Sequence, residues 1–482
     1  NFHEVRSMYY ANQEEKDGTI KVMLHSKNNL FMKVSEGTYT PYYNTYYQNM
    51  LYRVEKERGF ESMESHFMPG YFEVEIGKNE ERVVEFVASL NDPQEFLMKA
   101  NASQIILNEE TRLQKYCKMG EANSETEKSL VVAADSFIIE KSYGKTIIAG
   151  YPWFGDWGRD TFIALEGLLL KTNRYHDAKS ILKTFSKHIK DGLIPNLIDE
   201  NGGQSYNSVD ASLWYIHAVY QYYQYTHDED FIRELHPKMM EIIHAYQTGT
   251  QFGIRMDEDG LITAGNEQTQ LTWMDAKVEG TIPTPRHGKA VEVNALWYNA
   301  LNIMNQFSAI CHVSFDTELI AKVKQSFQKF YTNRGLLDTI EPISNQVRPN
   351  QIFAVSLDFP VVDTDKANEI VTLVEEELLT DRGLKTLNKE DKEYRPRYEG
   401  DSFARDTSYH QGTVWPWLFM GYMEACYRLR RNMKVTLPIE EMLQEKCIGN
   451  ICEIYDAEEP RRANGAPCQA WSFATLIQVV KT

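Results

Sequence analysis

Residues 149–160, AGYPWFGDWGRD, bring together side chains of the types that bind and process carbohydrates. Trp153 and Trp157 lie beside Arg159 and Asp160, with glycines between them. This combination of residues is not typical of a core helix, because the acid and the arginine would be buried against the tryptophans. In a concave site, aromatic rings cover the apolar face of a sugar, while carboxylate and guanidinium groups bind its hydroxyl groups. This segment therefore favours a sugar site.

Five further segments share this chemistry. Each places Trp, Arg, Asp or Glu, often with Gly or Pro, directly before an apolar stretch with helical periodicity. They cover residues 192–219, 270–297, 347–357, 408–422 and 449–476. One such segment would be weak evidence, but six in the C-terminal part of one chain are difficult to explain as core. We expect them to gather around one pocket.

Two carboxyl groups on either side of the scissile bond are what glycoside hydrolysis requires. The general acid should have apolar neighbours, because loss of hydration raises its pKa and keeps it protonated. Asp275, within LTWMDA, fits this best, although a helix cap or a buried ion pair with Lys277 or Arg286 is the alternative. Residue spacing alone does not identify the general base. Its candidates are Glu453, Asp456, Glu458, Glu459, Asp210 and Glu292.

The same segments supply candidate substrate-binding side chains. The candidates for stacking against sugar rings are Trp153, Trp157, Trp273, Trp415 and Trp471. The candidates for binding hydroxyl groups are Arg159, Asp160, Asn207, Asp210, Lys277, Arg286, Glu292, His410 and Gln411. For every polar residue in this set, the alternative is a salt bridge or cap that braces a loop. His410 is as compatible with holding its loop as with touching sugar.

Motifs for metals and nucleotide cofactors are not found in the sequence. There is no HExxH, the acidic loop at residues 199–203 does not follow the D-x-D-x-D-G pattern, and there is no glycine-rich phosphate loop. We therefore expect no metal and no cofactor. The six cysteines form no C-x-x-C, so we expect reduced thiols and a cytoplasmic protein, while their even number leaves disulfides possible.

Composition narrows the class of protein. The 482 residues exceed one ordinary domain, and a hydrophobic content of 42% with 25% charged residues is typical of a globular protein. A net charge of −18 argues against partners such as nucleic acid or an anionic membrane, both of which need a basic surface. A neutral α-glucan is compatible with it. No apolar run reaches the about 18 residues that a membrane-spanning helix needs.

The distribution of patterns predicts a multidomain chain. Residues 1–92 alternate short β-rich runs with turns, which predicts an antiparallel β-sandwich or part of one. Residues 93–128 read as a linker helix, and residues 129–482 as about a dozen helices with long loops. The predicted helices are 94–119, 125–140, 160–171, 175–191, 209–226, 228–250, 289–307, 317–331, 364–379, 412–431, 439–450 and 469–481, with one possible helix near 352–361. This pattern suits an all-α toroid of helical hairpins.

The motifs resemble the C-terminal domain of glycogen debranching enzymes, the amylo-α-1,6-glucosidase family. The similar stretches are AGYPWFGDWGRDTFIAL, DGLIPNLID, YNSVDASLWY, TWMDAK, TPRHGKAVEVNALWY, RPNQIFAVSL, YHQGTVWPW and CQAWSFATL, in the family's order over roughly residues 130–482. The resemblance implies an (α/α)6 toroid that follows the β-sandwich in the chain. It also implies inverting hydrolysis of α-1,6-linked glucose. By motif position it implies Asp275 as general acid and Glu453 as general base. The resemblance is to the short prokaryotic type of this family, because no glucanotransferase domain is recognisable.

Other functions on the same scaffold stay open from sequence. A trehalase-like or glucoamylase-like enzyme would keep the toroid and change the substrate. A phosphorylase would replace the catalytic base with phosphate and needs basic groups near Asp275, for which His287 and Lys289 are the nearest candidates. A non-catalytic glucan-binding protein would bind sugar without turnover, although both candidate carboxylates are present.

Overall fold

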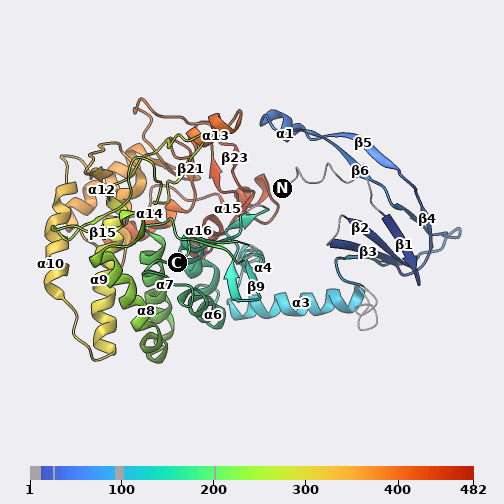
Figure 1. Ribbon diagram of the computed structural model, residues 1–482, viewed down its shortest axis with the longest axis horizontal. Coiled ribbons are helices and arrows are strands. Elements are labelled where there is room, and N and C mark those ends of the chain that lie inside the picture. The colour runs from blue at the N-terminus through green and yellow to red at the C-terminus, as the bar shows by residue number, and fades with distance from the viewer. Residues whose placement is uncertain (1–11, 25–27, 93–101, 153, 200–201, 482) are drawn as a thin grey trace. The chain divides into compact units, whose positions relative to one another are not determined.

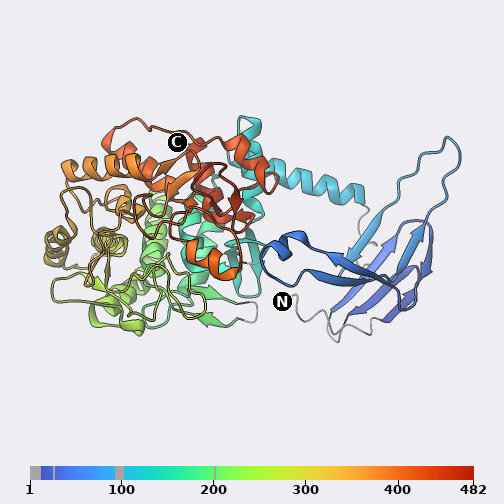
Figure 2. The same cartoon turned by 90° about the horizontal axis from the view of Figure 1, so that it is seen from above.

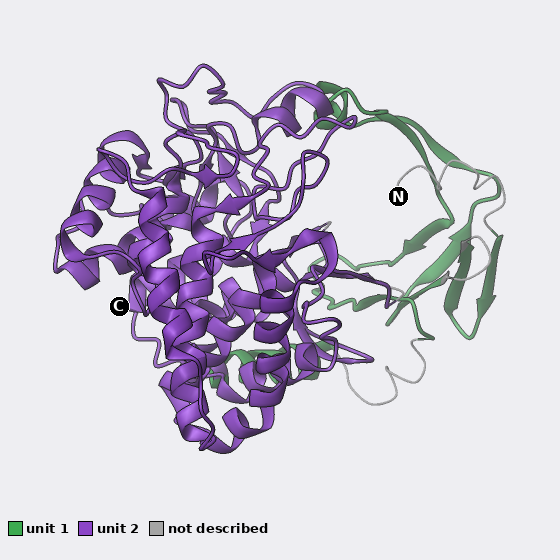
Figure 3. Cartoon of the chain, turned by 60° about the vertical axis from the view of Figure 1, so that its left-hand side comes forward, with its two compact units in different colours: residues 1–115 green, residues 116–482 purple. Residues whose placement is uncertain are grey.

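The chain folds, in a computed structural model, into two compact units, residues 1–115 and 116–482 (Figures 1 and 3). The structure describes residues 12–24, 28–92, 102–152, 154–199 and 202–481. The start of the predicted helix 94–119 and the predicted ligand Trp153 lie outside this part, and the described remainder of that helix is α3 (Ala102–Met119).

The N-terminal unit consists of antiparallel strands, as predicted. Four of them form one sheet in the order β1-β2-β3-β8, and the others pair as β4-β7 and β5-β6. The strands are β1 (Asn12–Lys16), β2 (Thr19–Leu24), β3 (Asn28–Val34), β4 (Thr38–Pro41), β5 (Tyr46–Leu51), β6 (Met63–Phe67), β7 (Gly70–Glu73) and β8 (Phe86–Ser89), with the short helix α1 (Arg53–Glu57) between β5 and β6. Alternate side chains of β2 point to the inner face of the sheet, where Ile20 and Val22 are buried.

The C-terminal unit is built around a closed ring of inner helices. Each inner helix packs against the next, and the last packs against the first. They are α5 (Gly158–Leu165), α7 (Ala211–Thr226), α9 (Val291–Ile310), α11 (Phe353–Ser356), α14 (Leu418–Leu429) and α16 (Ala470–Lys481). They are buried on nearly all sides, as helices surrounded by other helices must be. Figure 2 shows the same unit from a perpendicular direction.

An outer layer of amphipathic helices covers this ring. The outer helices that pack on inner ones are α4 (Glu125–Asp135), α6 (Tyr175–Ser186), α8 (Glu229–Thr248), α10 (Thr317–Ser326) and α12 (Thr364–Glu377). In α8, for example, Phe231, Leu235, Met239 and Ile242 recur at helical spacing on the buried face. Aspartate side chains cap α8, α10 and α12 by accepting backbone N–H bonds. This alternation of inner and outer helices confirms the predicted toroid.

Short antiparallel ladders join four of the six motif segments to one another before the inner helices. The strand β11 (Gly150–Tyr151) pairs with β24 (Cys468–Gln469), and β12 (Asp156–Trp157) pairs with β13 (Leu197–Ile198). A five-stranded sheet connects residues 379–385, 414–415 and 454–464 through β19 (Leu379–Thr380), β20 (Gly383–Lys385), β21 (Val414–Trp415), β22 (Ile454–Tyr455) and β23 (Ala463–Asn464). The loops are therefore held to one another as well as to their helices.

The bounds of several helices differ from those that their hydrophobic pattern indicates. The predicted helix 125–140 ends at Asp135, because residues 138–147 form the hairpin β9 (Ile138–Lys141) and β10 (Gly144–Ile147). The predicted helix 412–431 begins only at Leu418, since residues 414–415 pair with other strands and Pro416 follows. The predicted helix 160–171 begins at Gly158 as α5 and continues as the π-helix η2 (Glu166–Leu170). Two further helices are α13 (Ser402–Ser408), which was not predicted, and α15 (Ile439–Glu445).

Within the described ranges, none of the helices combines the length and apolar character that crossing a membrane requires. All six cysteines have free thiols.

Candidate active site

Asp275 lies on the loop before α9, between buried neighbours and an open side. Trp273 and Met274 are buried, whereas the Asp275 side chain keeps 31% of its surface exposed. Burial raises the pKa of Asp275, and the Arg159 guanidinium opposes that rise. Arg159 Nη1 donates to Asp275 Oδ2 at 3.1 Å. A proton on this carboxyl group therefore belongs on Oδ1, the oxygen that does not face the guanidinium.

Arg159, in the first turn of α5, connects three motif segments. Its Nε donates to Asp210 Oδ1 at 2.8 Å, and its Nη2 donates to Ser208 Oγ at 3.2 Å and to the Leu271 carbonyl at 3.3 Å. The side chain is 2% exposed. Because Asp210 and Asp275 are held by the same guanidinium, Arg159 fixes the orientation of the candidate acid. Arg159 therefore braces the site.

Glu453 lies directly before β22 and is 3% exposed. The Ala466 N–H donates to Glu453 Oε2 at 3.1 Å, and the Glu453 N–H donates to the Ala466 carbonyl at 2.9 Å. Burial, with a smaller contribution from the Asp275 charge, raises the pKa of Glu453 to about 7, although hydrogen bonds from Tyr409 and Ala466 oppose the rise. A carboxyl group of this kind exchanges its proton near neutral pH.

Gly465 allows Glu453 to approach the backbone this closely. Its φ is +67°, and a Cβ atom added there would lie 2.4 Å from Glu453 Oε2. Any side chain would therefore be strained by the backbone conformation and would collide with the carboxylate. Gly465, in the segment ANGAPC, therefore leaves free the space that the Glu453 carboxylate occupies.

A third carboxyl group, Asp160, lies within the electrostatic range of both candidates. Burial raises the pKa of Asp160 to about 8; Arg159 opposes the rise, and the charges of Asp275 and Glu453 add to it. Gln469 Nε2 donates to Asp160 Oδ1 at 3.2 Å. Asp160, Asp275 and Glu453 therefore form one cluster, in which burial and mutual repulsion favour keeping some groups protonated. A site of this kind can hold one carboxyl group as an acid and another as a base.

Three of the predicted stacking residues, Trp273, Trp415 and Trp471, pack with Trp417 in one aromatic cluster. Trp273 contacts Trp415 and Trp417, with ring centroids 5.3 and 5.1 Å apart, and Trp417 stacks on Trp471 at 5.0 Å. All four indoles are less than 5% exposed, and Trp273 Nε1 donates to Asn350 Oδ1 at 2.8 Å. They support the motif loops from within. Trp157, in contrast, is half-buried and meets Phe154 edge-to-face.

Four of the predicted hydroxyl ligands have protein partners or lie at the surface. Arg286 binds Glu292 and Asp338 in a buried network, in which Arg286 Nε donates to Asp338 Oδ2 at 2.7 Å. Gln411 accepts from Arg348 Nη2 and donates to the Pro283 carbonyl, both at 2.6 Å. Lys277 is exposed, and its ammonium lies 3.4 Å from the Gln268 carbonyl.

Two other predicted ligands, His410 and Asn207, lie beside residues of these networks. His410 is 1% exposed and stacks on Trp415, and neither of its ring nitrogens has a hydrogen-bond partner among the described residues. Burial holds the pKa of His410 well below its usual range, with nearby arginines adding to the effect, so the ring is neutral. Asn207 is half-buried and precedes Ser208, which contacts Arg159.

Replacing Arg286 with alanine should destabilise the C-terminal unit by about 3–5 kcal/mol, because Glu292 and Asp338 would remain buried without their cation. Urea unfolding followed by circular dichroism measures this change. The matched control is Arg334→Ala, because Arg334 binds Glu376 and Glu377 at the surface, where such pairs contribute about 0–1 kcal/mol. Equal stability of the Arg286 variant and the wild type would contradict the buried network.

Sequence reasoning missed several residues that support the candidate acid and base. Tyr409 bonds to Glu453, Gln469 holds Asp160, Ser208 holds Arg159, and Asp338 balances Arg286. Tyr409, Gln469 and Ser208 each lie next to, or two residues from, a residue that the sequence singled out. Asp338 lies in none of the six segments, and no pattern in the sequence marks it.

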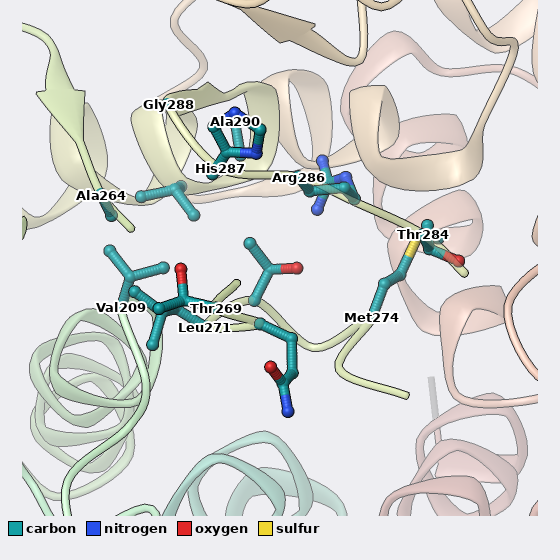
Figure 4. Close-up of a pocket in the computed structure, with 13 residues that line it drawn as sticks. Val209, Ala264, Thr269, Leu271, Met274, Thr284, Arg286, His287, Gly288 and Ala290 are labelled. Atoms are coloured by element: carbon teal, nitrogen blue, oxygen red, sulfur yellow. The ribbon is translucent and has the colours of Figure 1, made fainter. Parts of the chain in front are cut away.

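A small hollow lies beside the loop of Asp275, lined among others by Leu271, Met274, Thr284, Arg286 and His287 (Figure 4). Its volume of about 10 Å³ is enough for one water molecule, not for a sugar. Asp275 is not among the residues that line it. The hollow is thus a packing feature beside the loop and not a site for a sugar.

The model of the family described as amylo-alpha-1,6-glucosidase matches residues 129–478, which include all six motif segments. The chain belongs to this family. A second model, described as glycogen debranching enzyme N terminal, matches residues 1–83. Membership confirms the resemblance seen in the sequence, and it makes the chain a member of a glycoside hydrolase family.

The chain is also similar to individual known proteins. The chain is 25% identical to the glycogen debranching enzyme of Saccharomyces cerevisiae over 458 residues, 69% of this chain, and it spans only 30% of that relative. A bacterial glucoamylase solved with acarbose matches 96% of this chain and 72% of its own, with a TM-score of 0.62 and 15% identity. The GH63 mannosylglycerate hydrolase of Thermus thermophilus, solved with glucose, matches 72% and 98%, with a TM-score of 0.51 and 13% identity. At these identities the solved structures confirm the fold alone.

Proposed function

We propose that this chain hydrolyses the α-1,6-linked glucose at branch points of glycogen-like glucans, with inversion at the anomeric carbon. The single observation that supports this most is the convergence of Asp275 and Glu453, from motif segments far apart in sequence, into one electrostatically coupled cluster. Family membership supports the glucan as substrate.

In the proposed mechanism, the Asp275 carboxyl group protonates the glycosidic oxygen from Oδ1 as the bond to C1 breaks. Glu453 removes a proton from the water that attacks C1 from the opposite face, so that β-glucose leaves. We expect the two carboxyl groups to stand about 6.5–9.5 Å apart, which leaves room for that water. In this proposal, Asp160 and Asp210 accept hydrogen bonds from the sugar hydroxyl groups.

The test of this function is the identity and anomeric form of the released sugar. The purified chain is incubated with a glucosyl-branched limit dextrin, and the first product is followed by NMR. Early β-glucose supports inverting α-1,6 hydrolysis, and early α-glucose overturns inversion. Parallel reactions with maltose and trehalose, and with added phosphate, separate the glucoamylase-like, trehalase-like and phosphorolytic alternatives. Glucan binding without any turnover would favour a binding protein.

The activity of the free enzyme should fall as the pH drops below about 7. Glu453 must be ionised to act as base, and its pKa is raised to about 7 by burial, so protonation removes the active form. The pH dependence of kcat/KM reports this pKa. The matched variant is Tyr409→Phe, which removes a hydrogen bond that favours the ionised form. Its acid limb should move to higher pH, and an unmoved limb would contradict the contact.

A further inference from the structure

Two thiols lie in contact at the base of the loop that carries Glu453. Cys447 follows α15 and Cys468 begins β24, and their Sγ atoms are 2.8 Å apart. A disulfide bond requires about 2.05 Å, so a small movement would bring the two sulfur atoms to bonding distance. Residues 448–467, which lie between them, include both Glu453 and the Ala466 N–H that binds it.

The surroundings of the pair favour thiol chemistry over metal binding or simple packing. Cys447 is partly exposed, whereas Cys468 is 8% exposed. The third thiol of the loop, Cys452, is buried and donates to the Ile454 carbonyl at 3.2 Å. In the part of the chain that the structure describes, no group of three or more His, Cys, Asp or Glu is arranged to hold a metal ion. The pair is therefore an accessible thiol next to a shielded one.

The position of Cys468 connects the pair to the carboxyl cluster. Its neighbour Gln469 donates its N–H to the Ile451 carbonyl at 3.0 Å, two residues before Glu453. The Gln469 side chain holds Asp160. A movement of Cys468 toward Cys447 would therefore be transmitted to Asp160 through Gln469, and to Glu453 through Ile451.

We propose that Cys447 and Cys468 form a reversible disulfide with a low-molecular-weight disulfide such as oxidised glutathione as the oxidant, and that this bond slows hydrolysis by displacing Gln469 and the Glu453 loop. The Cys447 thiolate attacks one sulfur of oxidised glutathione and releases one glutathione thiolate. The Cys468 thiolate then attacks the Cys447 sulfur and releases the second. The two cysteines lose two electrons and two protons, and one oxidised glutathione becomes two reduced molecules.

The order of the two steps follows from exposure. Burial raises the pKa of Cys468 to about 12, so this thiol is the poorer first nucleophile. Cys447 is the thiol that oxidised glutathione can reach. Once the mixed disulfide has formed, the contact between the two sulfur atoms favours closure, because the second attack is intramolecular.

The experiment uses the full chain and two independent readouts. After treatment with oxidised glutathione, the wild type should retain four of its six thiols, and its mass should fall by two hydrogen atoms. Trypsin should then yield peptide 447–461 joined to peptide 463–481, and fragmentation distinguishes Cys447 from Cys452. These measurements need no substrate, so they test the disulfide even if the proposed function, on which the rate effect rests, fails.

The second readout is the rate of glucose release before and after oxidation. We expect kcat to fall about tenfold and to recover with dithiothreitol, since displacements near 1 Å at a catalytic group have effects of this size or larger. Cys447→Ser should be insensitive to oxidation, and Cys468→Ala checks the same point from the shielded side. Cys311→Ser, which removes a partly exposed thiol at the end of α9, should respond like the wild type.

Four outcomes would overturn the proposal. The first is a wild type that keeps all six thiols under oxidation, and the second is a disulfide between other cysteines. The third is a loss of rate that Cys447→Ser shares, and the fourth is an oxidised wild type with unchanged kcat.

Discussion

Asp275→Asn should lower kcat on a branched glucan by about 10³-fold or more, because the amide cannot deliver a proton to the glycosidic oxygen. The oxygen of the new amide can still accept from Arg159, which preserves the contact that positions this side chain. The variant should therefore remain folded with similar affinity for substrate. Steady-state kinetics on a glucosyl-branched limit dextrin measure the effect.

A leaving-group comparison separates an acid from a merely structural residue. An aryl glucoside whose leaving group needs no protonation should recover much of its rate with Asp275→Asn. The control on the same loop is Glu279→Gln, an exposed carboxylate that should leave kcat unchanged. A fully active Asp275→Asn enzyme, or one equally slow on both substrates, would contradict the assignment of Asp275 as general acid.

Glu453→Gln should lower kcat by about 10²–10⁴-fold, because the attacking water loses the group that removes its proton. The amide oxygen can still accept from Ala466 N–H and Tyr409, so the loop should keep its conformation. In contrast to Asp275→Asn, this variant should stay slow on the activated aryl glucoside, since the attack of water is impaired whatever the leaving group. Rates on the two substrates are measured side by side.

The matched control for this variant is Asp456→Asn, which changes another buried carboxylate of the same loop. Asp456 accepts from the Tyr398 N–H at 2.9 Å and from Asn464 Nδ2 at 2.9 Å, so it braces the loop. It should affect stability more than kcat. If Asp456→Asn abolished turnover while Glu453→Gln did not, the role of base would belong to Asp456, which the sequence left as an alternative.

Together the two variants test a division of labour that depends on environment. Asp275 is partly exposed and held by Arg159, whereas Glu453 is enclosed by Tyr409, Ala466 and Gly465. Burial raises the pKa of Asp160, and the charges of Asp275 and Glu453 add to this rise. The same chemical group thus titrates differently within one cluster, because burial, hydrogen bonds and neighbouring charges differ at each carboxyl group.

The sequence alone determined the class of fold and the identity of the motif segments. Helical periodicity marked the helices of the toroid, because an apolar face must recur every three or four residues to be buried. Alternation marked the N-terminal strands for the same reason. Asp275 and Glu453 could be singled out because their segments match a family, and Asp275 also by its apolar neighbours. Helix ends such as Asp135 and Leu418 were missed, because strand pairing competes with the local helical pattern. An adjacent hairpin follows Asp135, whereas a distant strand pairs with the residues before Leu418.

Only the tertiary structure decided which polar residues face the cluster and which brace the scaffold. Arg286 and Arg159 look alike in sequence, yet one is neutralised by Glu292 and Asp338 and the other reaches Asp275. The tryptophans at positions 273, 415 and 471 pack on one another, although the sequence marked them as stacking surfaces for sugar. These outcomes depend on contacts between residues far apart in the chain. Local spacing carries no information about such pairs, because a charge finds its partner through the fold of the whole unit.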